Sequence, residues 1–237
     1  MSDPTRSRTA AARFVTSHSV LTLDARHPYV AKSLVDAQEM HRTVMSGFRG
    51  WVDDGSPDAR AQMGVLSTWT VNLKEAALVL VVQSKVAADW GHLPKGVLRE
   101  TPHLITVDHT FHVGDTVGFR SVVNPTYSKP RTASDGNLLR GRRVAHTNPD
   151  GVRKWCARRF GDGNGTGGDI GGAADPETIS VRMLPTVSSS VSHKGLKIAR
   201  AELRGSLTVT DPTVFVTALS DGVGRARAYS CGLVLTR

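Results

Sequence analysis

The chain ends in SDGVGRARAYSCGLVLTR, a segment that combines glycines and arginines before a short apolar run. Arg225 and Arg227 have the guanidinium groups that bind phosphates. Gly222 and Gly224 would let the backbone approach such a ligand, and residues 233–235 would anchor the segment in a sheet. The closing segment therefore predicts a loop that binds a phosphate chain.

Two further stretches, LLRGRRVAH and the PDGVRKWCARRF helix, concentrate basic residues that could line one channel with the closing loop. An ordinary solvated surface is the alternative for each of these charges. The residues expected to contact phosphates here are Arg131, Arg140, Arg142, Arg143, Arg153, Lys154 and Arg158.

The overall charge agrees with a polyanionic partner. Thirty Lys and Arg residues against 21 Asp and Glu give a net charge of +9, which favours nucleic acid over an acidic small molecule. Only 5% of the residues are aromatic, so base stacking on a sheet has little support. A folded RNA stem, which is recognised through its backbone and shape, fits better; a basic surface that only confers solubility is the alternative.

Several other classes of site and segment find no support. Cys156 and Cys231 lack metal-ligand spacing, and His103, His109 and His112 match no zinc pattern, so no metal is expected. The glycine-rich stretch at 161–173 lacks the Gly-Lys-Ser/Thr ending of a phosphate loop and is interpreted as a flexible insert. No apolar run could span a bilayer, and residues 1–12 lack the apolar region of a secretion signal, so a cytoplasmic location is expected.

The rest of the chain predicts an α+β fold in which the order β-α-β-β-α-β occurs twice, as in tandem ferredoxin-like domains. A disordered tail over 1–12, an N-terminal domain over 13–113 and a C-terminal domain over 114–237 follow from this order. The first half contains a strand over 14–23, a helix from Pro28 to about residue 50, a hairpin over 65–84, a helix over 87–99 and a strand over 103–111. The second half contains strands over 116–128, 178–185, 195–210 and 227–237, a helix over 149–160 and a helix capped by Asp211.

Three segments, DAQEMHRTVMSGF, VVNPTYSKPR and GVGRARAYSCGLVLTR, resemble the landmark segments of the CasE family, the CRISPR repeat-RNA endoribonucleases of the type I-E Cascade complex. The resemblance follows the same order across nearly the whole chain, and its glycine-rich end is the most diagnostic part. It implies a tandem ferredoxin-like enzyme that binds the hairpin of CRISPR repeat RNA and cuts at the 3′ base of the stem. It also implies other Cascade subunits as partners, a monomer in isolation and no cofactor.

The implied chemistry is a metal-independent transesterification in which the RNA 2′-hydroxyl attacks the phosphate and leaves 2′,3′-cyclic phosphate and 5′-hydroxyl ends. His41 stands at the family's histidine position, and histidine exchanges protons near neutral pH. Because His41 borders the apolar stripe of Ala37, Met40 and Val44, a buried structural histidine is the alternative.

The sequence differs from the family at two positions and has a counterpart of one further family hairpin. Some relatives carry a tyrosine where this chain has Gln38, which cannot exchange a proton, and many have glycine where this chain has Ser230. The family's hairpin at the stem base corresponds to TVSSSVSHKGLKI, with a solvated turn as the alternative. It makes Ser192 and Lys194 further catalytic candidates, and Ser190 and His193 candidates for phosphate contact.

Two alternative functions, from other classes of protein, remain open. One is a non-catalytic subunit that binds an RNA hairpin, in which His41 is structural. The other is a general basic protein of a ribonucleoprotein, which would bind without hairpin preference and with strong salt dependence.

Overall fold

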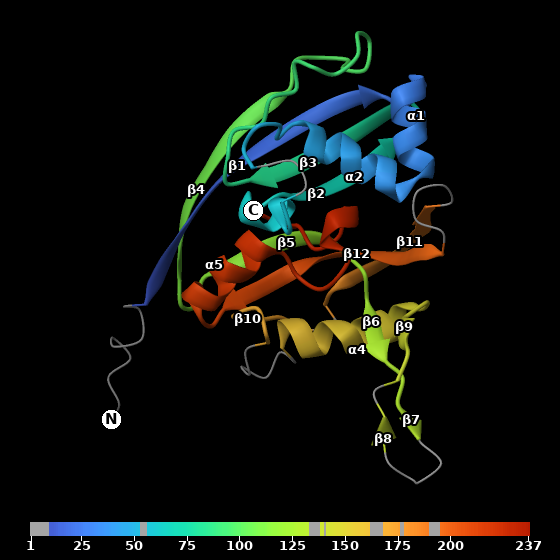
Figure 1. Ribbon diagram of the computed structural model, residues 1–237. Helices are drawn as coiled ribbons and strands as arrows, with labels where there is room; N and C mark the ends of the chain where they lie inside the picture. Colours follow the sequence, from blue (N-terminus) through green and yellow to red (C-terminus); the bar gives the residue numbers. More distant parts are fainter. Residues whose placement is uncertain are drawn as a thin grey trace, which may run out of the picture.

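The computed structural model describes residues 10–52, 56–132, 138–139, 141–161, 168–175, 178–189 and 195–237, with the backbone alone at 131–132 and 138–139. Figure 1 shows two antiparallel sheets, one above the other, with the C-terminal segment between them. Helices α1 (Pro28–Val35) and α2 (Ala37–Ser46) cover the first sheet. Within the described residues no helix could span a membrane.

The first sheet has the strand order β2-β3-β1-β4, in which every neighbouring pair is antiparallel. This is the order that a ferredoxin-like fold requires. Apolar side chains of the sheet, such as Leu21 and Leu80, pack against Met40 and Val44 of α2 in one buried cluster. The strands are β1 (Ala11–Asp24), β2 (Leu66–Asn72), β3 (Ala77–Ser84) and β4 (His103–His112).

The second sheet repeats this order as β11-β12-β5-β13, and the two-residue strand β10 (Gly172–Ala173) also pairs with β12. Helix α4 lies beneath it, on the side away from the first sheet, and α5 lies between the two halves (Figure 1). Asp211 caps α5 by accepting hydrogen bonds from the Thr213 and Val214 amides, as expected. The elements are β5 (Thr116–Val123), α4 (Pro149–Phe160), β11 (Ser180–Ser189), β12 (Leu196–Val209), α5 (Pro212–Asp221) and β13 (Val234–Thr236).

One hydrophobic cluster contains residues of both halves. Phe14 and Phe111 of the first sheet belong to the cluster that holds Phe215 of α5 and Phe119 of β5. The rings of Phe111 and Phe215 meet edge to face, with 5.0 Å between their centroids. Because these large side chains interdigitate across the boundary, the relative position of the sheets is set by packing.

The helix predicted from Pro28 to about residue 50 is wrong in one respect, because it is two helices. Asp36 separates them in an extended conformation, with φ −126° and ψ 117°. Its carboxylate accepts hydrogen bonds from the Gln38 and Glu39 amides, at 2.8 and 3.4 Å. Asp36 thus begins a new helix, α2, and sets its direction separately from α1.

The helix predicted over 87–99 is also wrong, since the described chain forms turns there. Pro94 and Gly96, the latter with φ +84°, oppose helix formation. The segment instead inserts the buried Trp90 against Gly47, where a Cβ atom would lie 2.6 Å from the indole. Its apolar residues therefore fill the core beside α2 without forming a helix.

Two predicted strands are shorter than expected. The strand over 116–128 is interrupted at Asn124 and Pro125, which divide it into β5 and β6 (Thr126–Ser128). The strand over 227–237 begins only at Val234, because residues 227–229 form a 3-10 turn, η2 (Arg227–Tyr229). Short elements that the sequence did not predict are α3 (Ala59–Gln62), β7 (Arg131–Thr132), β8 (Leu138–Leu139) and β9 (Arg143–Ala145). Strand β10 was not predicted either, and it shows that the end of the stretch interpreted as a flexible insert is paired with β12.

Candidate functional site

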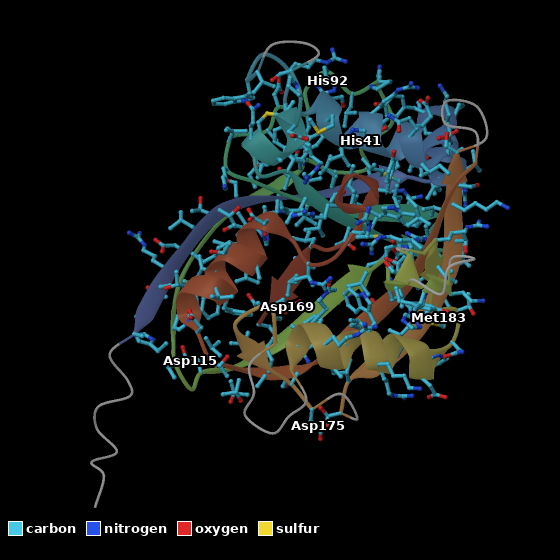
Figure 2. All side chains as sticks on the ribbon, turned by 60° about the horizontal axis from the view of Figure 1, so that its bottom comes forward. His41, His92, Asp115, Asp169, Asp175 and Met183 are labelled. Carbon is cyan, nitrogen blue, oxygen red and sulfur yellow. The ribbon has the colours of Figure 1, made fainter. Side chains whose placement is uncertain are left out.

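His41 lies on α2 at the edge of the first core, where it is half-buried, while its neighbour Met40 is fully buried. Its ring faces Tyr229 of the closing segment, with 6.1 Å between the centroids and 58° between the planes. Figure 2 labels His41 among the helices of the first sheet, apart from Asp169 and Asp175 of the second half. His41 therefore sits where the closing segment of the second half meets the first half.

Burial lowers the pKa of His41, a hydrogen bond with the Ala228 backbone opposes this, and the positive charges of Arg60 and Arg42 lower it further. A lowered pKa leaves the imidazole neutral at pH 7. A neutral imidazole can accept a proton, which is what attack by a 2′-hydroxyl requires.

Positive charge lies close to this histidine from two elements, since Arg42 of α2 and Arg60 of α3 both act on it. Arg60 of α3 is half-buried and donates to the Val65 carbonyl at 2.7 Å. Arg227 is close enough to Arg60 to lower its pKa, after the larger effect of burial, and donates to the Asp221 carbonyl at 2.7 Å. Sequence reasoning missed Arg60, because no pattern in its segment links it to His41.

The closing segment passes between the halves, and two of its glycines allow this path. A Cβ atom at Gly222, with φ +79°, would lie 2.8 Å from Leu66 of β2. A Cβ atom at Gly224, with φ +81°, would lie 3.0 Å from Trp155 of α4. Both glycines therefore have a packing role, and their contact with RNA stays a prediction. Strand β13 pairs with β5, so the expected anchoring in the second sheet is confirmed at Val234 and Leu235.

Ser230, the position at which relatives often have glycine, keeps a glycine-like conformation with φ +58° and ψ +38°. Its buried hydroxyl shares a hydrogen bond of 2.9 Å with Ser67 of β2. The preceding turn begins after Ala226, which also has φ +58°. The turn directs Tyr229 toward α2, where its hydroxyl donates to Gln38 Oε1 at 3.3 Å. The sequence could not predict this contact, because no local pattern links residues 191 positions apart.

The predicted hairpin of the second half is attached directly to α2. Ser189 and Leu196 pair at the start of the hairpin formed by β11 and β12. The Ser189 hydroxyl donates to Asp36 Oδ2 at 3.0 Å, so the hairpin contacts the residue that caps α2. The predicted site residues Ser190, Ser192, His193 and Lys194 lie outside the described residues.

The structure brings some of the predicted basic residues together. Arg143 of β9 and the exposed Lys154 and Arg158 of α4 line one hollow of about 430 Å³. Tyr127 and His146 stack beside it, with 4.6 Å between their ring centroids. Within the described part of the chain these three basic side chains form no ion pair. They are therefore available to a phosphate backbone.

Other predicted basic residues are placed differently. Arg153 pairs with Asp150 on α4, with 3.1 Å between the charged atoms. Arg142 and Arg225 are exposed. Arg140 and the side chain of Arg131 lie outside what the structure describes. The closing segment lies close to Trp155 of α4 at Gly224 and contacts α2 through Tyr229.

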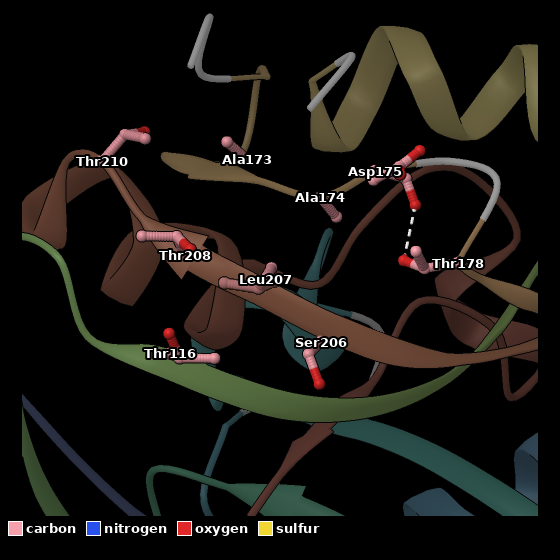
Figure 3. A pocket seen from close by; sticks show the side chains of 9 residues that line it. All are labelled: Thr116, Ala173, Ala174, Asp175, Thr178, Ser206, Leu207, Thr208 and Thr210. Carbon is pink, nitrogen blue, oxygen red and sulfur yellow. Dashed lines mark hydrogen bonds between the residues drawn. The ribbon is translucent and has the colours of Figure 1, made fainter. Parts of the chain in front are cut away.

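A second hollow, of about 420 Å³, lies between β10 and the end of β12 (Figure 3). Its lining consists of hydroxyl and small side chains with one carboxylate, Asp175. The Thr178 hydroxyl donates to the Asp175 carbonyl at 2.8 Å across its rim. Since neither a histidine nor a basic side chain lines it, it suits phosphate chemistry less well than the surroundings of His41.

Comparisons with solved structures find the same architecture. Cse3 of Thermus thermophilus, bound to an RNA representing a pre-cleavage complex, is 22% identical with a TM-score of 0.67, over 94% of this chain and 99% of that chain. Cas6e of Escherichia coli str. K-12 is 20% identical with a TM-score of 0.61, over 93% and 98%. A chain titled as part of a CRISPR RNA-guided surveillance complex is 18% identical with a TM-score of 0.59, over 93% and 98%.

These likenesses confirm the predicted α+β class with ferredoxin-like halves. No curated protein is significantly similar to the chain. A family model described as CRISPR associated protein matches residues 18–237. Since this match covers almost the whole sequence, the chain belongs to that family of CRISPR-associated proteins, as its landmark segments predicted.

Proposed function

We propose that this protein is a metal-independent endoribonuclease that binds the stem-loop of CRISPR repeat RNA and cleaves it at the 3′ base of the stem. The observation that carries the proposal is the half-buried His41, with a lowered pKa, at the contact between α2 and the closing segment. Family membership and likeness to a structure titled as CRISPR endoribonuclease Cse3 bound to RNA support the same conclusion.

The RNA supplies its own nucleophile in this reaction. His41 exchanges a proton with the reacting group while the 2′-hydroxyl attacks the adjacent phosphate and the 5′-oxygen leaves. Arg60 lies close to the histidine and Arg227 lies close to Arg60, so both can stabilise the charge that develops on the phosphoryl oxygens. The products are a 2′,3′-cyclic phosphate and a 5′-hydroxyl. Ser192 and Lys194 of the hairpin remain proposed contributors.

The stem is bound by the basic hollow and the residues around it. Arg143, Lys154 and Arg158 lie together on one surface and can contact successive phosphates. Removing the charge of Lys154 or Arg158 is expected to reduce the salt dependence of binding by about one unit of slope each. The other proposed RNA contacts are Arg131, Arg140, Arg142, Arg153, His193, Gly222, Gly224, Arg225 and Arg227.

The protein acts in the cytoplasm as a monomer, retains the cut hairpin and joins the other Cascade subunits. Likeness to a chain of an RNA-guided surveillance complex supports this assembly. Release of the hairpin would then limit turnover, so catalysis has to be measured in a single turnover.

The test is cleavage of the repeat hairpin of the same genome by excess protein in EDTA, beside a hairpin with a 2′-deoxy nucleotide before the expected cut. Cleavage of the first hairpin alone, with a cyclic phosphate end, is expected. Cleavage of both would contradict attack by the 2′-hydroxyl, and cleavage that requires added metal would contradict the metal-free reaction.

A second candidate is a non-catalytic subunit that binds an RNA hairpin. The basic hollow favours it, because Arg143, Lys154 and Arg158 come together without any contribution from His41. Tight binding of the repeat hairpin without cleavage of either RNA would support this candidate and exclude the nuclease.

A further inference from the structure

We propose that Tyr229 is a catalytic residue whose phenolic hydroxyl donates a proton to the departing 5′-oxygen. This inference rests on the proposed function and adds to it the group that acts opposite His41. It follows from the position of Tyr229 against α2 and from the way its turn is held. It also follows because Gln38, its hydrogen-bond partner, cannot exchange a proton.

The position of Tyr229 is defined by two contacts with one face of α2. Its hydroxyl donates to Gln38 Oε1 at 3.3 Å, and its ring lies 6.1 Å from that of His41. Gln38 and His41 are three positions apart on the helix, so their side chains are neighbours on its surface. Tyr229 thus brings a phenol to the helical face that carries the histidine, from the other half of the molecule.

The turn that presents Tyr229 is held on both sides. Ala226 and Ser230 both have φ +58°, a left-handed conformation that costs an alanine or a serine free energy. The Ser67 hydroxyl compensates by its buried hydrogen bond of 2.9 Å to Ser230. The Tyr229 ring packs against the small cluster of Val122, Ile198 and Cys231. These features keep the aromatic ring in place and leave the hydroxyl at the surface of α2.

The Tyr229 hydroxyl can exchange its hydrogen bond with Gln38 for one with the substrate. Gln38 is a neutral acceptor at 3.3 Å, which is longer than the about 2.5–3.0 Å usual for an O–H···O hydrogen bond. A phenol both donates and accepts hydrogen bonds, whereas a glutamine side chain cannot take part in proton exchange. When RNA occupies the site, the 5′-oxygen can replace Gln38 Oε1 as the acceptor.

The reaction balances with these two residues. The O2′–P bond forms as the 2′-hydroxyl proton passes to the imidazole of His41, and the P–O5′ bond breaks as O5′ takes the proton of the Tyr229 phenol. The resulting imidazolium and phenolate return to their starting states by one proton transfer, directly or through water. Nothing is oxidised or reduced.

The state of His41 agrees with this division of roles. Burial lowers its pKa, and Arg60 and Arg42 lower it further, against the opposing hydrogen bond with the Ala228 backbone. The imidazole is therefore neutral at pH 7 and ready to accept a proton. Because a neutral imidazole has no acidic proton to donate at the start of the reaction, a nearby phenol can protonate the leaving oxygen while the histidine accepts the 2′-hydroxyl proton.

The experiment compares two hairpin substrates in single turnovers. One carries the ordinary phosphate at the cut, and the other carries sulfur in place of the bridging 5′-oxygen, because a thiolate leaves without being protonated. On the ordinary hairpin, Tyr229→Phe is expected to cleave about 10²-fold more slowly than the unmodified protein. On the 5′-thio hairpin, the two proteins are expected to cleave at closely similar rates.

Tyr29→Phe is the matched control, since Tyr29 is also half-buried but lies on α1, and it should change neither rate. Hairpin affinity and thermal unfolding of Tyr229→Phe are measured in parallel and should be unchanged. An ordinary rate equal to that of the unmodified protein, or a loss of equal size on both substrates, would overturn the proposal. Failure of the unmodified protein to cleave either hairpin would instead contradict the proposed function itself.

Discussion

Among the contacts that join the halves of this molecule, one is a cluster of charged side chains and another is a neutral contact between a tyrosine and α2. At the first, Glu202 of β12 is only 3% exposed and pairs with Arg120, Arg182 and Arg204, at 2.5, 2.7 and 3.1 Å. Arg120 also donates to Thr70 of β2 at 2.7 Å, which extends the charge cluster to the first sheet. At the second, Tyr229 meets Gln38 and His41 through one neutral hydrogen bond and a ring contact.

The difference shows which contact holds the fold and which can change with substrate. Removing one partner from a buried, hydrogen-bonded carboxylate cluster is strongly destabilising, because it leaves charge uncompensated. Nearby, the Arg200 guanidinium lies 4.2 Å above the Trp69 ring and joins the same two strands, β12 and β2. A single neutral hydrogen bond contributes only about 1 kcal/mol, so Tyr229 can exchange its partner without moving the sheets.

The largest effect is expected from removing the histidine of the neutral contact. His41→Ala should slow single-turnover cleavage about 10³-fold, because no other proton acceptor replaces the imidazole. Hairpin affinity should stay the same. His103→Ala, at an exposed histidine of β4, is the control and should cleave normally. If His41→Ala lost stability and kept its cleavage rate, His41 would be a structural residue.

The next effect concerns the charged contact. Glu202→Gln removes the carboxylate that three arginines share and should lower the free energy of unfolding by about 3 kcal/mol. Urea denaturation measures this change. Asp108→Asn, which removes the exposed ion pair with Arg13, is the control and should have little effect. Equal losses in the two variants would mean that burial does not strengthen the Glu202 cluster.

The same cluster has a distinct dependence on pH. Burial opposes ionisation of Glu202, but hydrogen bonds from Arg120, Arg204 and Arg182 outweigh it and lower its pKa from 4.5 to about 2. Its ionised form therefore stabilises the fold fully above pH 4.5, and this contribution is lost as the pH falls toward 2. The difference in unfolding free energy between wild type and Glu202→Gln should shrink over that interval; a constant difference would contradict it.

A smaller effect is expected at the hydroxyl pair beside the neutral contact. Ser67→Ala leaves the buried Ser230 hydroxyl without its partner and should cost about 1 kcal/mol of unfolding free energy. Adding Ser230→Gly removes the unpaired hydroxyl and relieves the positive φ, so the double variant should recover this loss. Strictly additive losses in the double-mutant cycle would show that the two serines do not interact.

The smallest effect is a shift in the pH profile of cleavage. If neutral His41 accepts the proton, the single-turnover rate should rise with pH, with its midpoint below the ordinary histidine value of 6.5. Arg42→Gln removes one of the positive charges that lower the pKa of His41, so it should move the midpoint upward by a fraction of a unit. A midpoint above 6.5, or a shift downward in the variant, would contradict this electrostatic account.

The local sequence pattern was sufficient to predict much of the fold. The proline and polar cap of α4 and the Asp211 cap of α5 determine where these helices begin, and alternating apolar residues define β1 and β12. The helical periodicity after Pro28 was sound, but it could not reveal the break at Asp36, whose carboxylate caps a second helix. The segment over 87–99 has enough apolar residues for a helix, yet it serves to place Trp90 in the core.

By itself, the sequence determined the family and the two sheets and indicated His41 as the catalytic candidate, because these depend on local order and on motifs that lie within single segments. The tertiary structure alone decided that Tyr229 meets Gln38, 191 positions away, and that Arg60 lies close to both His41 and Arg227. No periodicity links residues so far apart. Their approach depends on the shared aromatic core, which sets one sheet against the other and carries the closing segment to α2.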